Sequence, residues 1–217
     1  MRSAWVFLVA GCGFQSQPAE LDGVPGVVDA SPGTGPADGP DADATPGPFD
    51  YARCPASYTN DDLPGPSRYR LIPDGHRAWE QSDACNGDLS GATHLVILET
   101  AAEVSRVAAL VDQPRMGIAH SAVWVGGVQR ATATQPGAAW LGFDGAPLID
   151  LWDDGEPNDD GHSGEADHRE QFAMIEHHNT ALEDTDGRIA AGALCECDGH
   201  PPPAEVLATI DANRLPE

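Results

Sequence analysis

The most chemically suggestive part of this sequence is an acidic stretch, Trp152–Asp184, in which carboxylates surround a Glu-Pro-Asn tripeptide. The tripeptide spans Glu156–Asn158 and places a carboxylate and an amide on either side of a proline, a residue that favours turns. Carboxylate and amide oxygens are ligands that calcium prefers in proteins. The stretch therefore predicts a site for a hard divalent cation.

Other interpretations of this stretch compete with a calcium site. A run of charges often forms a solvated loop and nothing more. Five of its residues have a spacing like that of an EF-hand loop, but the proline at the second position and the lack of flanking helices make the match poor. Four histidines in or after the loop could bind a transition metal, although histidines in polar loops are more often solvated. The EF-hand positions are Glu156, Asn158, Asp160, Gly161 and Asp167, and the histidines are His162, His168, His177 and His178.

Catalysis finds little support among the residue patterns. A pair of carboxylates could cleave a glycoside only if an apolar pocket raised the pKa of one of them. Carboxylates gathered around a calcium ion stay ionised instead. No Ser-His-Asp arrangement, phosphate-binding glycine loop or reactive cysteine stands out in the sequence. We therefore expect a binding protein and not an enzyme.

The charge balance limits the partners of this chain. Its 217 residues include 35 acidic and 11 basic ones, the latter all arginine, for a net charge of −24. Such a charge repels nucleic acid phosphates and anionic membrane surfaces, and it suits divalent cations. No stretch approaches the roughly 18 apolar residues of a membrane-spanning helix. We expect no nucleic acid partner, and membrane contact only through a lipid anchor.

The first 50 residues indicate export and not a fold. Residues 1–12 contain a short apolar run that ends in Val9-Ala10-Gly11-Cys12 and resembles the lipobox of bacterial lipoproteins, in which the cysteine carries the lipid. Residues 13–50 are rich in Pro, Gly, Ala and Asp and cannot bury a core, so they predict a flexible tether. We expect Cys12 to be lipidated and the exported protein to be held at the cell envelope, on the outer membrane or the cell surface.

A globular domain is expected over residues 51–198, followed by a tail over residues 199–217. Two helices are predicted in the domain, one at His76–Cys85 that Asn86-Gly87 would end, and one at Thr100–Asp112. The second begins with a capping box of Thr100 and Glu103 and then repeats apolar residues with helical spacing. Short apolar runs predict strands at 68–72, 94–98, 122–128, 172–175 and 192–196.

Two regions lack such periodic patterns. The long segment before the acidic stretch carries Trp140, Phe143 and Trp152, which we expect to anchor an irregular loop to the core. In the tail, one or two helical turns are expected over Ala204–Asn213, and we assign them no function.

The remaining cysteines, Cys54, Cys85, Cys195 and Cys197, are even in number. In an exported chain that favours two disulfides, with three possible pairings. Cys195 and Cys197 are too close for a comfortable mutual bridge, so each is expected to pair with a distant partner. No second Cys-x-x-Cys or histidine pair accompanies them at zinc-ligand spacing.

From Cys54 to Cys197, the order of the motifs resembles that of a C-type lectin-like domain. The opening Cys54–Tyr58 resembles the family's first strand, Trp124–Gly127 its Trp-Ile-Gly-Leu strand, and Cys195-Glu196 its closing Cys-Glu pair. The remaining matches lie in its helices and neighbouring segments, at Trp79, Ala84, Cys85, Gly91, Ala92, His94–Ile97, Glu103 and Trp152. The resemblance implies an α+β fold, with two helices packed on small antiparallel sheets and a long irregular loop region.

The resemblance also implies how the cysteines pair. In the family, the helix-one cysteine pairs with the closing one, which here implies a Cys85–Cys195 bridge. Cys54 and Cys197 would then join the two ends of the domain. The family's inner disulfide is missing, because its expected positions hold Phe172 (or its neighbour) and Gly187.

A calcium site with named ligands follows from the same resemblance. Carried over by motif, the ligands are Glu156 and Asn158, with a cis bond before Pro157, and Asp184 of a Leu-Glu-Asp sequence. Glu183 stands where the family has asparagine, so it keeps an oxygen ligand and loses an amide donor. The remaining carboxylate is assigned to Glu170, with Glu165 as the alternative.

Calcium-dependent carbohydrate binding is the function that the resemblance implies. In the family, the ligands of the ion also hydrogen-bond vicinal sugar hydroxyls, and Glu-Pro-Asn accompanies mannose-type sugars. The residues that would contact sugar are Glu156, Asn158, Glu170 and Glu183. The alternative is a calcium-stabilised or calcium-free scaffold that binds a surface protein through its long loop, and position 183 is where the two interpretations diverge.

Overall fold

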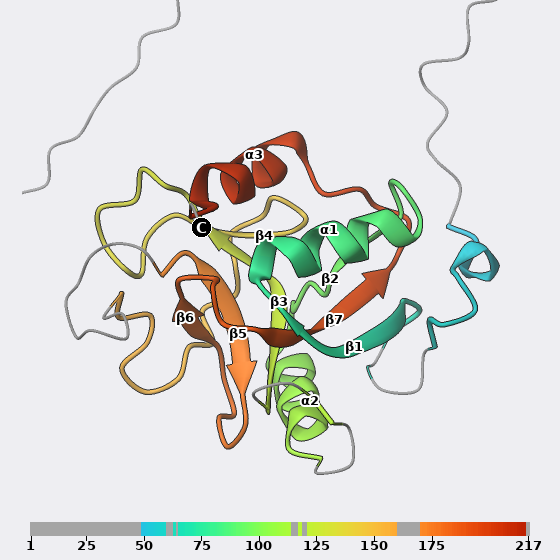
Figure 1. Ribbon diagram of the computed structural model, residues 1–217, viewed down its shortest axis with the longest axis horizontal. Helices are drawn as coiled ribbons and strands as arrows, with labels where there is room; N and C mark the ends of the chain where they lie inside the picture. Colours follow the sequence, from blue (N-terminus) through green and yellow to red (C-terminus); the bar gives the residue numbers. More distant parts are fainter. Residues whose placement is uncertain are drawn as a thin grey trace, which may run out of the picture. The chain divides into compact units, whose positions relative to one another are not determined.

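A seven-stranded sheet forms the centre of the computed structural model and confirms the α+β class (Figure 1). The structure describes residues 49–59, 63, 65–113, 117–118, 121–159 and 170–215. Its helices are η1 (Tyr51–Arg53), α1 (Ala78–Asp88), α2 (Ala101–Val111) and α3 (Ala204–Asn213). Its strands are β1 (Arg68–His76), β2 (Thr93–Leu95), β3 (Ala122–Gln129), β4 (Trp140–Gly142), β5 (Phe172–Glu176), β6 (Glu183–Thr185) and β7 (Ala191–Cys197).

The strands form one mixed sheet, where the sequence predicts several small antiparallel ones. Their order is β1-β7-β3-β5-β6, with β2 paired to β7 and β4 paired to β3. The central pair, β3 and β7, is parallel, and the other pairs are antiparallel. The pairing of β1 with β7 brings the start and the end of the predicted domain side by side.

Helices cover both faces of the sheet (Figure 1). The helices α1 and α3 contribute to one core layer and α2 to the other. Side chains of β3 alternate between the layers, with Ala122 and Trp124 in the first and Val123 and Val125 in the second. Because both faces are buried, β3 has a continuous apolar sequence and not an alternating one.

The helix α1 ends later than predicted. The Asn86-Gly87 pair was expected to stop it after Cys85, whereas it continues to Asp88. Asp88 accepts a hydrogen bond of 2.7 Å from the Tyr58 hydroxyl and forms an ion pair with Arg70. These long-range contacts hold the last turn and override the local stop signal.

The helix α2 begins as predicted. The Thr100 hydroxyl accepts a hydrogen bond of 3.2 Å from the Glu103 N–H, and the Glu103 carboxylate accepts one of 2.9 Å from the Thr100 N–H. The apolar side chains of its predicted face, Val104 and Val107 among them, are buried in the second core layer. The capping box and the core-facing stripe are therefore confirmed.

The helix α3 packs on the core, which the tail pattern does not predict. Val206 and Ile210 are buried among the residues of the first core layer. At the end of the helix, the Asn213 side-chain amide donates a hydrogen bond of 2.7 Å to the Gln129 carbonyl of β3. A third helix is thus added to the two that the resemblance implies.

Both disulfides form in the pairing that the resemblance implies. Cys85 bonds Cys195 and Cys54 bonds Cys197, with Cα atoms 5.4 Å and 6.0 Å apart. The first links α1 to β7, and the second links the start of the domain to the end of β7.

Another segment of backbone passes close to β3 at Gly126. The Gly126 N–H donates a hydrogen bond of 2.7 Å to the Val96 carbonyl, and a Cβ at Gly126 would lie 2.7 Å from that oxygen. A register irregularity interrupts the pairing of β3 with β5 between Trp124 and Val128. Glycine is needed here because another backbone passes where a side chain would stand.

Several predictions lie outside the described residues, among them the lipidation of Cys12 and, up to residue 48, the linker expected over residues 13–50. The acidic loop between residues 160 and 169, with the alternative ligand Glu165, lies outside them too. No helix in the described part of the chain is both long and apolar enough to cross a membrane.

Candidate functional site

Aromatic side chains anchor the loop that carries the Glu-Pro-Asn tripeptide. Trp140 and Phe143 are buried, as expected, and Trp152 packs on Trp140 with ring centroids 4.7 Å apart. The Trp140 indole N–H donates a hydrogen bond of 2.7 Å to the Pro136 carbonyl. This packing fixes the start of the loop a few residues before Glu156.

Backbone hydrogen bonds then dock the loop against the segment that enters β6. The Leu182 N–H donates to the Leu151 carbonyl and the Asp153 N–H to the Leu182 carbonyl, both at 2.9 Å. Trp152 and Leu182 form an isolated parallel bridge. The two halves of the predicted site, distant in sequence, are joined by this bridge.

Asp184 holds the end of the loop in place. One of its carboxylate oxygens accepts a hydrogen bond of 3.0 Å from the Asn158 N–H, and the other accepts one of 3.1 Å from the Asp159 N–H. Asp184 is itself buried in β6, so the bonds are shielded from water. Both residues after Pro157 are therefore positioned by the side chain that the sequence assigns as a cation ligand.

Glu156 and Asn158 interact with each other across Pro157. The Glu156–Pro157 peptide bond is cis, as the resemblance implies. The Asn158 side-chain amide donates a hydrogen bond of 2.7 Å to Oε1 of Glu156. The other oxygen, Oε2, is buried and has no hydrogen-bond partner among the described residues. A buried carboxylate oxygen without a donor is unfavourable unless a proton or a cation reaches it.

Asn179 is a site residue that the sequence does not predict. It lies in the turn between β5 and β6, and its side-chain amide donates a short hydrogen bond to Oε1 of Glu183. An amide donor therefore lies beside position 183, where the family's own amide is replaced by a carboxylate. No family motif covers the turn, and only the four-residue spacing of Asn179 and Glu183 could have indicated the contact.

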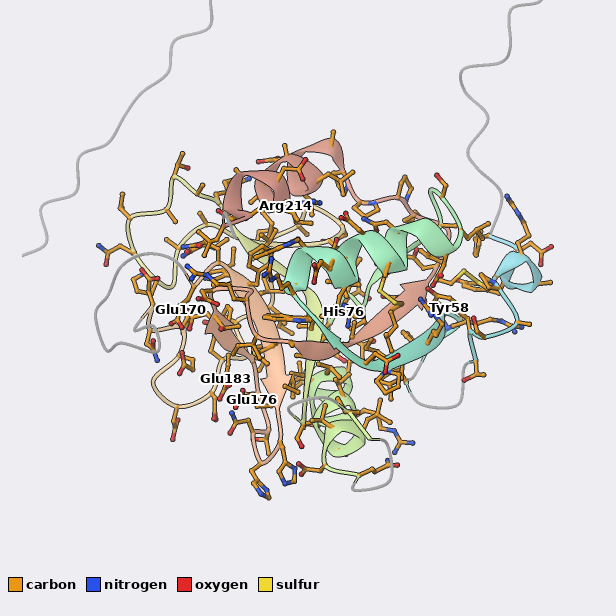
Figure 2. All side chains as sticks on the ribbon, viewed as in Figure 1. Tyr58, His76, Glu170, Glu176, Glu183 and Arg214 are labelled. Carbon is orange, nitrogen blue, oxygen red and sulfur yellow. A yellow bond between two sulfur atoms is a disulfide. The ribbon has the colours of Figure 1, made fainter. Side chains whose placement is uncertain are left out.

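Glu170 lies beside the site, two residues before the first residue of β5 (Figure 2). Its side chain is buried, and its N–H donates a hydrogen bond of 3.1 Å to the Asp159 carboxylate. Figure 2 shows Glu170 and Glu183 on the same side of the molecule, at the β6 edge of the sheet. Asp159, which bridges Asp184 and Glu170, is a second residue that the sequence did not single out.

Burial and crowding raise the pKa values of two of these carboxyls. Burial raises the pKa of Glu156 to about 8, and the nearby carboxylates of Asp184 and Glu183 add to the effect through their negative charge. Burial likewise raises the pKa of Glu183 to about 7, and the negative charges that add to it are those of Glu176, Asp153, Asp184 and Glu170. The described residues thus gather more negative charge at this site than they neutralise with side chains of their own.

Solved structures of C-type lectins have the same architecture. CEL-I from Cucumaria echinata matches with a TM-score of 0.52 and 17% identity, over 66% of this chain and 96% of its own. Human lithostathine matches with a TM-score of 0.53 and 18% identity, over 71% of this chain and 97% of its own. The chain has the C-type lectin-like fold. The EPNH mutant of CEL-I matches equally well, with a TM-score of 0.52 and 19% identity.

Comparisons with protein-family models and with curated proteins found no match. At these identities the structural likeness concerns the C-type lectin-like fold, so the ligands of this site are judged on its own residues.

The residues at this site of the C-type lectin-like fold suit a hard divalent cation. All the side chains offer carboxylate or amide oxygens, the ligand type that calcium prefers. A bound cation would supply a partner to Oε2 of Glu156, which has none in the described part of the chain. It would also offset the crowded negative charge that raises the pKa values of Glu156 and Glu183. No imidazole or thiol is among the described side chains of the site, and oxygen ligands alone suit calcium better than a softer metal.

The predicted ligands are neighbours but do not form a tight cage. Within the described ranges, no three of their carboxylates lie within 4.8 Å of one another. Calcium takes about six to eight ligands, so Asn158, backbone carbonyls, water and a bound ligand would fill the remaining positions. A cavity of about 450 Å³ lies elsewhere, lined by Tyr69, Glu103 and Glu196 among others, and none of the predicted ligands lines it.

Proposed function

We propose that this protein is a calcium-dependent carbohydrate-binding module that is displayed on a cell surface. The calcium ligands would be Glu156, Asn158, Glu170, Glu183 and Asp184. The observation that carries the proposal is a buried carboxylate oxygen of Glu156 that has no hydrogen-bond partner among the described residues. It lies next to Asn158, whose backbone N–H is held by Asp184. The C-type lectin-like fold supports it, because the structural neighbours include lectins.

Sugar recognition would use the same side chains. A bound calcium ion supplies a charge that attracts vicinal hydroxyl oxygens. Glu156 and Glu183 offer carboxylates that accept hydrogen bonds from hydroxyl protons, and the Asn158 amide can donate to a hydroxyl oxygen. The Asn179 amide beside Glu183 is positioned to supply the donor that Glu183 lacks. A mannose-type glycan is the partner that we propose for this arrangement.

The raised pKa of Glu156 does not by itself indicate catalysis. A glycoside-cleaving pair needs one carboxyl that is protonated and one that is ionised, so its two pKa values are separated. Here the pKa values of Glu156 and Glu183 are both raised, to about 8 and about 7. Crowded cation ligands behave in this way, so we propose a binding protein and not an enzyme.

Calorimetric titration of the full chain with calcium tests the cation site. Glu156→Gln removes a charged ligand and is expected to weaken calcium binding at least about tenfold, the scale on which ligand-shell changes act. Asp154→Asn is the matched control, because Asp154 is exposed in the same loop and its loss changes the charge equally. Equal affinities for the wild type and Glu156→Gln would exclude the site.

A glycan panel then tests sugar binding. Mannose-type glycans are expected to bind in calcium and to be released by a chelator, whereas galactose-type glycans are not. Asn179→Ala should weaken sugar binding more than it weakens calcium binding, because Asn179 hydrogen-bonds the proposed ligand Glu183 but is not itself a proposed ligand. Calcium binding without any glycan signal would favour the alternative, a calcium-stabilised scaffold that binds a surface protein through its loop.

Display would come from the first 50 residues. We propose that Cys12 carries a lipid and that residues 13–50 form the tether to the cell envelope. A single sugar site binds weakly, so many anchored copies would be needed for useful avidity. Detergent phase partitioning of the wild type and Cys12→Ser tests the anchor, since only the wild type is expected in the detergent phase.

A further inference from the structure

A second cluster of potential metal ligands lies where the turn after β5 meets the end of α2 (Figure 1). It consists of Asp112, His177 and His178, whose ligand atoms all lie within 4.8 Å of one another. Asp112 caps α2, and the two histidines directly follow the last residue of β5. All three residues are exposed, and the carboxylate site uses none of them.

Hydrogen bonds fix the backbone around this cluster. The His178 N–H donates a hydrogen bond of 2.9 Å to Oδ1 of Asp112, and Nδ1 of His177 lies 2.7 Å from the same oxygen. The His177 N–H donates one of 2.7 Å to the Ser121 carbonyl beside β3. The turn is therefore held to two neighbouring elements, and both imidazoles are carried beside one carboxylate.

The two imidazole rings also lie against each other. Their centroids are 3.5 Å apart, with the planes tilted by 37°. Two protonated imidazoles would repel each other at this separation, whereas two neutral ones can share a metal ion. The two rings are therefore close enough to present nitrogens to one metal ion.

The chemistry of this donor set differs from that of the carboxylate site. Imidazole nitrogens with one carboxylate suit zinc and copper, and calcium prefers oxygen alone. Three protein ligands leave a fourth position for water or another ligand. A cavity of about 250 Å³, lined by Asp112, Ile118, Ser121 and His177 among others, provides room beside the cluster.

We propose that Asp112, His177 and His178 form a site for a divalent transition metal ion of the zinc and copper class. The ion would tie the end of α2 to the β5–β6 turn. Zinc ligands lie about 2.0–2.2 Å from the metal, so the side chains must draw together slightly, and their exposure leaves them free to rotate. The site does not rest on calcium or sugar binding.

Zinc titration of the full chain, with calcium in excess to occupy oxygen-only sites, tests the proposal. The wild type is expected to bind one zinc ion that His177→Ala, His178→Ala and Asp112→Asn each weaken at least about tenfold. His200→Ala is the matched control, since His200 is a single exposed imidazole 3.1 Å from the Asp198 carboxylate. The control should bind zinc as the wild type does.

Cobalt replaces zinc in a second measurement that reports on the ligands directly. The visible absorption bands of protein-bound cobalt are expected in the wild type and absent from the His177→Ala/His178→Ala double variant. Thermal unfolding of each variant shows that its fold is kept, because exposed substitutions change stability by about 0.5 kcal/mol or less. Unchanged zinc affinity and an unchanged cobalt spectrum in the folded double variant would overturn the proposal.

Discussion

The aromatic ring of Phe172 lies directly against the backbone of Gly187. A Cβ built on Gly187 would meet the ring at 2.6 Å, and Gly187 has a φ of +76°, which favours glycine. These residues stand at the two positions where the family resemblance places an inner disulfide. A ring packed on a glycine fills that space here, and Phe172 also packs beside Trp79 and Trp124.

Gly187→Ala should therefore destabilise the domain in two ways. The alanine would be strained at a positive φ, and its Cβ would overlap the ring of Phe172. Gly91→Ala is the matched control, because Gly91 has a φ of +77° and open space around its Cα. Both variants place an alanine at a positive φ and share that destabilisation. Only Gly187→Ala also overpacks against Phe172, which adds about 1–3 kcal/mol. Urea denaturation of the two variants measures the difference. Equal free energies of unfolding would show that the ring moves aside without cost.

Asp184→Asn should release the loop that carries Glu156 and Asn158. The substitution keeps the size of the side chain. However, the amide NH₂ would face one of the two backbone N–H groups that now donate hydrogen bonds to the carboxylate. Hydrogen bonds to charged groups contribute about 1.5–3 kcal/mol to stability. Chemical denaturation should therefore show a decrease of that size in the free energy of unfolding. Asp154→Asn, in the exposed part of the loop, should be nearly neutral.

His94 should make the stability of the domain depend on pH. Its Nδ1 lies 2.8 Å from the Leu95 carbonyl and its Nε2 lies 3.0 Å from the Asp198 carboxylate, so both ring nitrogens donate when the ring is charged. Burial opposes the charge, but the hydrogen bond and charge of Asp198, with the Leu95 carbonyl, raise the pKa of His94 above 6.5.

The direction of the effect follows from that raised pKa. The stabilisation is fully present below pH 6.5, the ordinary pKa of the ring, and is lost as pH rises through the higher value in the folded domain. His94→Gln should flatten the fall in unfolding free energy above pH 6.5, measured by urea denaturation at several pH values. His200→Ala is the control, because His200 is exposed and contacts the same Asp198. A slope that His94→Gln leaves unchanged would refute the assignment.

The helix α3 should stabilise the domain, although the sequence predicts only one or two helical turns there and no packing on the core. Ile210→Ala removes a buried side chain of the first core layer and is expected to cost about 2–5 kcal/mol. Leu207→Ala, in the same helix, changes an exposed side chain and should cost about 0.5 kcal/mol or less. Thermal unfolding distinguishes the two, and equal melting temperatures would mean that α3 does not pack as described.

Much of the fold could be predicted because its signals are local or lie in ordered motifs. The capping box of Thr100 and Glu103 and the apolar run of β3 each follow from a few adjacent residues. The pairing of Cys85 with Cys195 followed from motif order and not from spacing. The end of α1 does not follow from adjacent residues, because Tyr58 and Arg70, far away in sequence, hold its last turn.

By itself, the sequence determined the fold class and the side chains that could bind a hard cation, because composition, capping and motif order are properties of the linear chain. Only the tertiary structure brought Asn179 to Glu183 as a partner and left Oε2 of Glu156 buried with no partner in the described ranges. It also joined Asp112 to His177 across 65 residues. Contacts of this kind depend on how strands and turns dock, and no local pattern encodes which distant residue fills the space beside another.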